Sequence, residues 1–159
     1  MIFITLGSQK FQFNRLLKAI DNLIDDGIIR EKVFAQVGYS DYIPKNYEFK
    51  NFLDREEFKK VMSNSDKVIT HGGTGAIVGA LKENKMVIAV PRLKEFGEHV
   101  DNHQLEITKL FKEMNYIAVV LECDKLGEII EKIDDIVFSK YKSNTENIIK
   151  SIKKFIDKI

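Results

Sequence analysis

The chain has 159 residues, of which 44% are hydrophobic, a length and composition that suit one domain with a substantial core. Charged residues make up 31% of the chain, but the two signs nearly cancel to a net charge of +1, which argues against a nucleic-acid-binding protein. The single cysteine, Cys123, excludes a disulfide framework and a cysteine-based metal site, and it fits an intracellular compartment.

Short apolar runs alternate with segments of helical periodicity, beginning with the run 2–6. In the first helical segment apolar residues recur on one face, and Asp54 is placed to cap the helix after the third run. The predicted strands are 2–6, 32–37, 47–53, 67–70, 86–90 and 117–121. The predicted helices are 15–24, 55–64, 74–83, 101–114, 125–138 and 144–158.

This alternation predicts the α/β class, with a doubly wound parallel sheet covered by helices on both faces. The sequence contains no repeats, low-complexity tracts or linkers, so we predict a single domain over 1–159. Its core is expected over about 1–122 and a helical tail over about 123–159. Ligands of such sheets bind beyond the carboxyl ends of the strands.

A glycine-rich turn, HGGTG at 71–75, joins the fourth predicted strand to a helix. Glycines let backbone N–H groups approach a ligand, and the helix behind them offers unpaired N–H groups and a positive dipole end. The turn therefore favours a phosphate or diphosphate. A tight packing turn is the alternative, although packing alone does not require His71 or Thr74. The spacing Gly73-x-Gly75-x-x-x-Gly79 matches a dinucleotide fingerprint only weakly, because that fingerprint belongs after the first strand.

Two further loops at the same edge of the predicted sheet carry polar groups. Gly7, Ser8 and Gln9 follow the first strand, where they form either a backbone nest or an ordinary loop. After the fifth strand, polar side chains suited to sugar or ribose hydroxyls crowd together. They are Glu98, His99, Asp101, Asn102, His103 and Gln104.

The second of these loops has two other interpretations. Asp101 or Asn102 could cap the following helix, with solvated neighbours. His99 and His103, four residues apart with Glu98 adjacent, could bind a metal in a metal-dependent hydrolase. The histidine pair straddles the expected helix start and no further ligand pair is visible, so we predict no metal.

The motifs THGGTG, VIAVPR and EFGEHVDNHQ follow the opening MIFITLGSQKFQFNRL in order, over residues 1 to about 120. Together they resemble the C-terminal domain of family 28 glycosyltransferases. Within that family they are similar to short bacterial Alg13-like subunits of exopolysaccharide and capsule assembly, of the PssE and EpsF type. The resemblance implies a Rossmann-like fold that forms one half of a GT-B enzyme, the half that binds a nucleotide-sugar donor.

The resemblance also implies where the donor lies. The glycine turn would face its diphosphate and sugar, and the backbone before the third predicted helix would face uracil. The implied donor-binding residues are Gly7, Ser8, Gln9, Phe52, Leu53, His71, Gly72, Gly73, Thr74, Gly75, Glu98, Asn102, His103 and Gln104. His71 is the candidate catalytic group, with a donor contact as the alternative. Longer relatives carry an acidic ribose-binding residue where this chain has Gly79.

The implied reaction is an inverting, metal-independent hexosyl transfer from a UDP-sugar to a lipid-linked saccharide. The UDP-sugar is a substrate, so no cofactor is expected. Because 159 residues supply only one half of a GT-B enzyme, the resemblance implies an Alg14-like membrane-associated partner, which could also supply the general base. A homo-oligomer is compatible with the sequence. The alternative is a non-catalytic nucleotide-binding or partner-stabilising module.

The sequence carries no secretory signal pattern and no apolar run near the roughly 20 residues of a membrane span. We therefore expect a cytoplasmic protein, peripheral at the inner face of the cell membrane through its partner. The last predicted helix carries an apolar stripe that suits packing on its own sheet, docking on a partner or binding an anionic membrane surface. The stripe comprises Ile148, Ile149, Ile152, Phe155, Ile156 and Ile159.

Overall fold

The computed structural model describes residues 1–144, 149 and 153, and these residues form one six-stranded sheet in the order β3-β2-β1-β4-β5-β6. Every pairing between neighbouring strands is parallel. The strands are β1 (Ile2–Thr5), β2 (Val33–Gln36), β3 (Glu48–Lys50), β4 (Lys67–Thr70), β5 (Met86–Ala89) and β6 (Ala118–Val119). This is the strand order of a Rossmann-like, doubly wound sheet, which confirms the predicted fold class.

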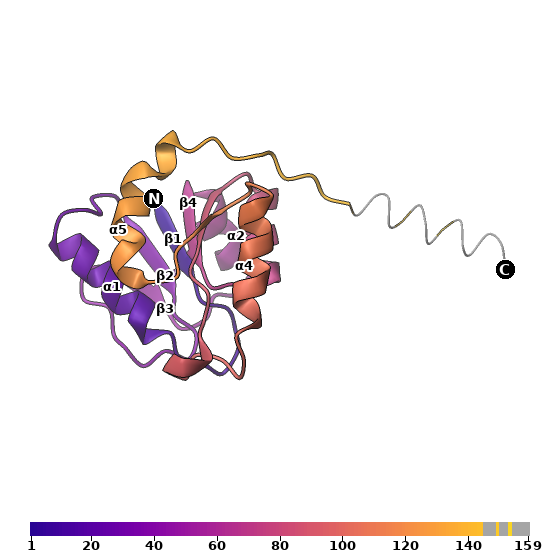
Figure 1. The fold of residues 1–159 in the computed structure, drawn as a ribbon. Helices are drawn as coiled ribbons and strands as arrows, with labels where there is room; N and C mark the ends of the chain where they lie inside the picture. Colours follow the sequence, from indigo (N-terminus) through magenta and orange to yellow (C-terminus); the bar gives the residue numbers. More distant parts are fainter. Residues whose placement is uncertain (145–148, 150–152, 154–159) are drawn as a thin grey trace.

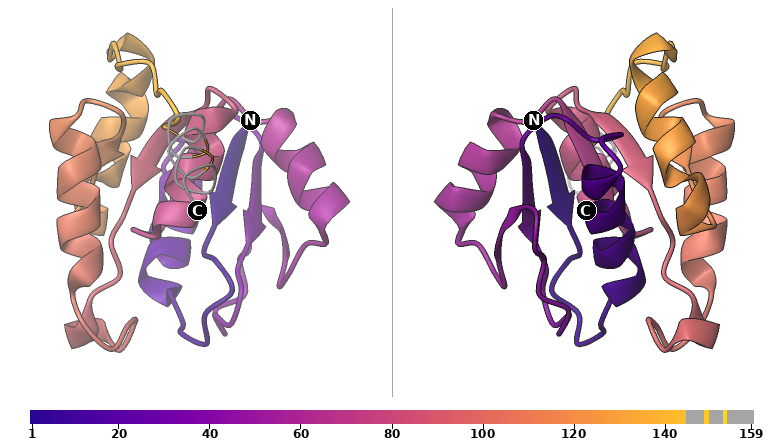
Figure 2. Two further views of the ribbon diagram at one scale, coloured as in Figure 1. Left: turned by 90° about the vertical axis from the view of Figure 1, so that its right-hand side faces the viewer. Right: turned by 90° about the vertical axis from the view of Figure 1, so that its left-hand side faces the viewer.

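Helices cover both faces of the sheet (Figures 1 and 2). One face carries α1 (Asn14–Asp25) and α5 (Leu126–Lys132), and the other carries α2 (Arg55–Ser63), α3 (Thr74–Lys82) and α4 (His103–Glu113). Short 3₁₀ helices follow in the connections: η1 (Lys94–Phe96), η2 (Cys123–Lys125) and η3 (Ile133–Asp135).

The sheet separates two apolar cores, because successive strand side chains point to opposite faces. Ile4 packs with Leu16 of α1 and Ile130 of α5, whereas its neighbour Phe3 packs with Ile77 of α3 on the other face. All four side chains of β1 and of β4 are buried. Burial on both faces explains why neither strand shows the alternation of apolar and polar residues that is typical of a half-exposed strand.

The predicted helix cap at Asp54 is confirmed, whereas the predicted bounds of the two edge strands are too long. Asp54 caps α2 through a reciprocal capping box: Glu57 N donates to Asp54 Oδ1 at 2.8 Å, and Asp54 N donates to Glu57 Oε2 at 3.3 Å. The strands at the two edges, β3 and β6, are shorter than the predicted 47–53 and 117–121, because each has a hydrogen-bonding neighbour on one side only.

The core extends past the predicted limit of about 122. Leu126, Ile130 and Ile133 are buried in the same core as α1, so the segment up to η3 belongs to the domain body rather than to a tail. The chain then crosses the amino-terminal edge of the sheet, where Ser139 N donates to Asn115 O at 2.8 Å (Figure 1). The predicted helix 144–158 and its apolar stripe lie outside the described residues, apart from the exposed Ile149.

No helix among residues 1–144 has both the length and the apolar character needed to cross a lipid bilayer.

Candidate functional site

The loops after β1 and β4 meet at the carboxyl edge of the sheet. The chain leaves β1 for α1 on one face and leaves β4 for α3 on the other, so the two connections diverge at a topological switch point, the place where doubly wound sheets bind ligands. We refer to this switch point, between residues 6–13 and 71–73, as the crevice. The turns after these strands are in contact. A Cβ atom placed on Gly7, which has a φ of 73°, would lie 2.7 Å from Cε1 of His71. The predicted convergence of the two turns is therefore present in the structure.

The glycines of the turn after β4 serve two different purposes. Gly72 and Gly73 are required by packing. A Cβ atom on Gly72 would lie 2.7 Å from Cβ of Gln104, and one on Gly73 would collide with the imidazole of His71. Gly75 is exposed, and a Cβ atom there would meet no described atom within 4 Å. Packing therefore explains Gly72 and Gly73 but does not explain Gly75.

The first turn of α3 is open toward the crevice. Its N-cap, Gly73, provides no side-chain capping bond in the described structure, and the first two helical residues, Thr74 and Gly75, are both exposed. Helices leave their first N–H groups without partners inside the helix, and the dipole makes this end positive. The turn can therefore donate several hydrogen bonds to one anionic group.

His71 lies between Gly7 and Gly73 as a neutral imidazole. Burial, and then the positive charge of Arg92, lower its pKa from 6.5 to about 4, although the Thr5 carbonyl opposes this change. The Thr70 hydroxyl donates to Thr5 O at 2.9 Å and lies 3.3 Å from Nδ1 of His71. Because that hydroxyl proton is already used, we infer that Nδ1 carries the ring proton and that Nε2 is an acceptor.

Gln104, on α4, joins the turn after β4 to the loop after β5. Its Oε1 atom accepts from Gly72 N at 3.0 Å and from Arg92 N at 2.9 Å, and the side chain is buried. We predicted a contact between Gln104 and the donor sugar. In the structure its carbonyl oxygen holds two backbone segments together, and the contact with the donor sugar stays a prediction.

Arg92 was missed in the sequence, although an arginine directly after a buried strand is an unusual feature. Its guanidinium donates to Leu6 O at 2.7 Å, to Phe11 O at 2.9 Å and to Glu98 O at 3.2 Å. The side chain is 1% exposed, and its Nε atom has no hydrogen-bond partner among the described residues. Arg92 therefore fastens the loop after β1 to the loop after β5.

Glu98 has a position that conflicts with its predicted contact to the sugar. The residue is fully buried, and its carboxylate accepts from Arg15 Nε at 2.9 Å, from Arg15 Nη2 at 3.0 Å and from Leu93 N at 3.0 Å. Both oxygens are thus occupied inside the protein. The structure assigns Glu98 to holding the loop after β5 against α1.

The remaining polar residues of this loop gather at the rim of the crevice. His99 Nε2 lies 3.0 Å from Gln9 Oε1, and His99 Nδ1 lies 3.1 Å from Asp101 Oδ1. His103 also contacts Asp101. Asn102 Oδ1 accepts from the backbone N–H of Lys94 at 2.8 Å and so orders the turn of η1. The structure therefore brings the predicted residues Gln9 and His103 together through His99.

The segment predicted to face uracil lies beside the turn after β1. Leu53 N donates to Gln36 Oε1 at 3.1 Å, so this N–H group is not free. Phe52 is exposed, and its ring centroid lies 5.2 Å from that of Tyr39. A Cβ atom on Gly38 would lie 3.0 Å from Gly7 O, which shows how closely the neighbouring loops approach.

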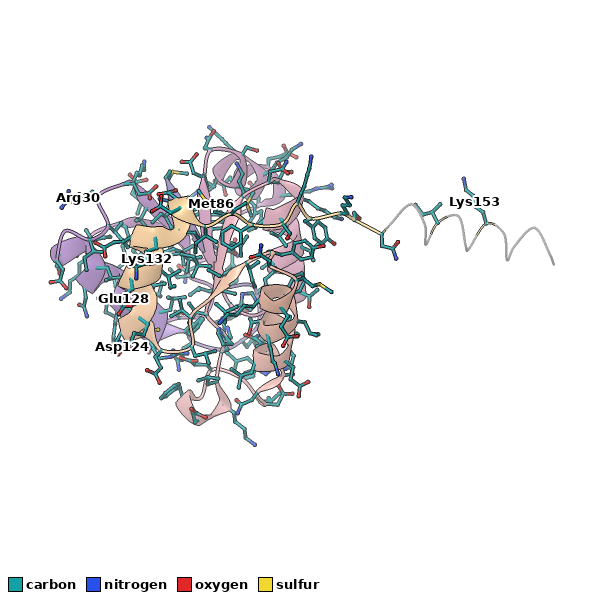
Figure 3. The ribbon with its side chains drawn as sticks, turned by 45° about the horizontal axis from the view of Figure 1, so that its top comes forward. Arg30, Met86, Asp124, Glu128, Lys132 and Lys153 are labelled. Carbon is teal, nitrogen blue, oxygen red and sulfur yellow. The ribbon has the colours of Figure 1, made fainter. Side chains whose placement is uncertain are left out.

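The opposite edge of the sheet offers a different environment. A hollow of about 570 Å³ lies there, between the end of α1 and the approach to β3, and Arg30, Glu31 and Lys45 are among its lining residues. Figure 3 brings this amino-terminal edge forward and labels Arg30 and Met86. The hollow contains neither the glycine turn nor a histidine, so the carboxyl edge remains the candidate site.

Solved structures with the same arrangement are glycosyltransferases. The glycotransferase of kitacinnamycin has a TM-score of 0.61 at 16% identity, with 83% of this chain and 34% of that one aligned. MurG of Acinetobacter baumannii has a TM-score of 0.54 at 16% identity, with 83% and 40% aligned. The domain therefore has the fold of one half of a GT-B glycosyltransferase.

The sequence comparison identifies the family. The chain belongs to the family described as the Glycosyltransferase family 28 C-terminal domain, which it matches over residues 1–159. The UDP-N-acetylglucosamine transferase subunit ALG13 of Candida albicans is 30% identical over 98 residues, which are 62% of this chain and 32% of that protein. The human subunit of the same name is 28% identical over 120 residues, 70% and 10% of the two chains. The predicted Alg13-like relationship is confirmed, and this chain spans 32% and 10% of the lengths of these two relatives.

Proposed function

We propose that this domain binds the UDP portion of a UDP-sugar in the crevice between β1 and β4, as the donor subunit of a glycosyltransferase. The observation that carries the proposal is the uncapped, exposed first turn of α3 that opens onto this crevice behind Gly73. Preorganised N–H groups and a helix dipole stabilise the charge that develops on a diphosphate leaving group without reorganisation in the transition state. The membership in family 28 supports the same ligand.

The lowered pKa of His71 bears on its role. A general base works best when its pKa lies near the working pH, whereas the pKa of His71 is about 4. The neutral ring cannot offset phosphate charge, but its Nε2 atom can accept a hydrogen bond from a sugar or ribose hydroxyl. We therefore assign His71 to donor positioning and place the general base on the partner subunit.

The reaction we propose is transfer of a hexose, with inversion, to a lipid-linked saccharide in exopolysaccharide or capsule synthesis. The acceptor half would come from an Alg14-like membrane-associated subunit, which would hold this chain at the inner face of the cell membrane. One finding supports a partner: the sequence relatives of this chain are named as transferase subunits.

Replacing Gly75 with aspartate tests the site directly. The side chain would enter open space, and a carboxylate in the first turn of a helix favours helix stability. The same charge would repel a diphosphate. Gly75→Asn has nearly the same shape without the charge and is the matched control. We expect calorimetry to show that UDP, but not NAD, binds the wild type and Gly75→Asn, and that Gly75→Asp binds UDP at least tenfold more weakly.

Equal UDP affinity in the two variants, or no binding of UDP to the chain alone and to the co-expressed pair, would contradict the proposal. Thermal unfolding of each variant separates loss of binding from loss of folding. If the pair binds UDP but transfers no hexose to lipid-linked acceptors, the non-catalytic module becomes the better description. One observation favours that second candidate: Gly79 leaves open space where longer relatives carry a ribose-binding acid.

A further inference from the structure

The side chains of His99, Asp101 and His103 converge at the start of α4. One imidazole nitrogen from each histidine and one carboxylate oxygen lie within 4.8 Å of one another. From the sequence we expected no metal, because the two histidines straddle a helix start and no further ligand pair was visible beside Glu98. In the structure the loop before α4 brings Asp101 between them. We propose that these three residues bind a divalent transition-metal ion of the Zn²⁺ class.

The chemistry of the donor set favours this class of ion. Two imidazole nitrogens with one carboxylate oxygen suit Zn²⁺, Co²⁺ and Fe²⁺, whereas Mg²⁺ prefers oxygen ligands alone. Three protein ligands leave a fourth position for water or for an oxygen atom of a bound molecule. This position would lie at the rim of the crevice, because Gln9 of the loop after β1 contacts His99.

The hydrogen bonds around His99 also favour a cation. This ring lies between two oxygen acceptors, Gln9 Oε1 at 3.0 Å from Nε2 and Asp101 Oδ1 at 3.1 Å from Nδ1. A neutral imidazole has one N–H group, so it can donate to only one of them. If Nε2 donates to Gln9, the lone pair of Nδ1 faces the carboxylate oxygen at 3.1 Å and has only a long contact, 3.4 Å, with the backbone N–H of Asp101. A metal ion between Nδ1 and Asp101 accepts both lone pairs.

The surroundings of His99 match those of a metal-binding histidine. Such histidines donate the other ring N–H group to an oxygen acceptor that fixes the orientation of the ring, and Gln9 Oε1 is in that position. Burial of His99 and the ring of Phe11, whose centroid is 5.2 Å away, hold the imidazole in place. Asp101 and His103 are exposed, so they can adjust to the ion. One ligand is therefore fixed and two are adaptable.

Titration of the tag-free, chelator-dialysed chain with Co²⁺ tests the proposal through the visible absorption of the bound ion. We expect one Co²⁺ per chain, displaced by Zn²⁺ but not by Mg²⁺. His103→Ala and Asp101→Asn should each weaken binding at least tenfold. Gln9→Ala should weaken it by roughly 10- to 100-fold, as expected for a residue that orients a ligand. Glu113→Gln, at the far end of α4, is the control and should bind as the wild type does.

Both ligand variants change exposed side chains, so we expect their thermal unfolding to match that of the wild type. Lack of stoichiometric binding, or equal affinity in Asp101→Asn, His103→Ala and Glu113→Gln, would overturn the proposal. The three residues would then form a hydrogen-bonded network in which the Gln9 amide is turned to donate to His99. The measurement does not involve UDP, so its outcome is independent of the proposed donor site.

Discussion

The buried imidazole of His71 predicts a specific dependence of folding stability on pH. In the folded chain its pKa is about 4, whereas an unfolded histidine has its ordinary value of 6.5. Between these values the unfolded state binds more protons than the folded state, so stability falls as the pH falls. The contribution is fully present above pH 6.5 and is lost progressively as the pH approaches 4.

Replacing His71 with asparagine removes this titration and leaves the other ionisable groups in place. From the two pKa values, the wild type should lose about 2.5 kcal/mol through His71 between pH 7.5 and pH 4.5. The difference in unfolding free energy between the wild type and His71→Asn should shrink by this amount over the same interval. Taking this difference cancels the carboxylates and the other two histidines.

Urea unfolding followed by circular dichroism at several pH values between 7.5 and 4.5 measures the effect. The absolute cost of His71→Asn at neutral pH reflects packing against Gly7 and Gly73 and does not enter the argument. Parallel stability profiles for the two proteins would refute the reasoning. They would mean that the ring titrates as an exposed histidine does, and that the crevice is more hydrated than the structure indicates.

Other substitutions test the frame around the crevice by urea unfolding at neutral pH. Gly72→Ala places a methyl group 2.7 Å from Cβ of Gln104 and should cost about 1–3 kcal/mol, whereas no loss would mean that α4 can move away. Gly79 lies in the middle of α3, where a Cβ atom would meet no described atom within 4 Å. Because alanine has the higher helix propensity, Gly79→Ala should stabilise the chain by about 1 kcal/mol, and destabilisation would contradict the open environment. Glu98→Ala leaves Arg15 without its buried partner and should cost roughly 3–5 kcal/mol. A loss below about 1 kcal/mol, typical of exposed pairs, would show that water reaches this pair.

The fold could be predicted because its signals are local. Most buried parallel strands give short apolar runs in the sequence. Asp54 and Glu57, three residues apart, form the capping box that predicts a helix start. The limits of β3 and β6 could not be predicted, because they depend on which strands lie at the edges of the sheet. The burial of Leu126 and Ile130 was missed for a similar reason: only the three-dimensional structure shows that α5 packs beside α1 on the same face of the sheet.

The position of the candidate site could also be predicted, since loops after neighbouring parallel strands must meet at one edge. The roles of individual residues could not. Glu98 and Gln104 look like ligand-binding residues in the sequence, yet the carboxylate of Glu98 is occupied by Arg15 and a backbone N–H group, and Oε1 of Gln104 is occupied by two backbone N–H groups. Arg92 was overlooked because its carbonyl partners come from distant segments of the chain, such as Leu6 and Phe11.

Arg15, Arg92 and Glu98 place buried charges next to the loops that form the candidate site. Arg15 forms an ion pair with the carboxylate of Glu98, and Arg92 donates to the main-chain carbonyl of the same residue. Two cations thus share one carboxylate, and one positive charge remains in a region of low dielectric. That charge helps to keep His71 neutral, and under the proposed function it would also attract the anionic donor to the turn after β4. Long polar side chains thus hold the loops in place and make the electrostatic potential of the site positive. In the proposed function, the backbone N–H groups in the first turn of α3 bind the donor. If this division is correct, donor affinity should respond more strongly to a charge at Gly75 than to loss of any one polar side chain at the rim, such as Gln9 or His103.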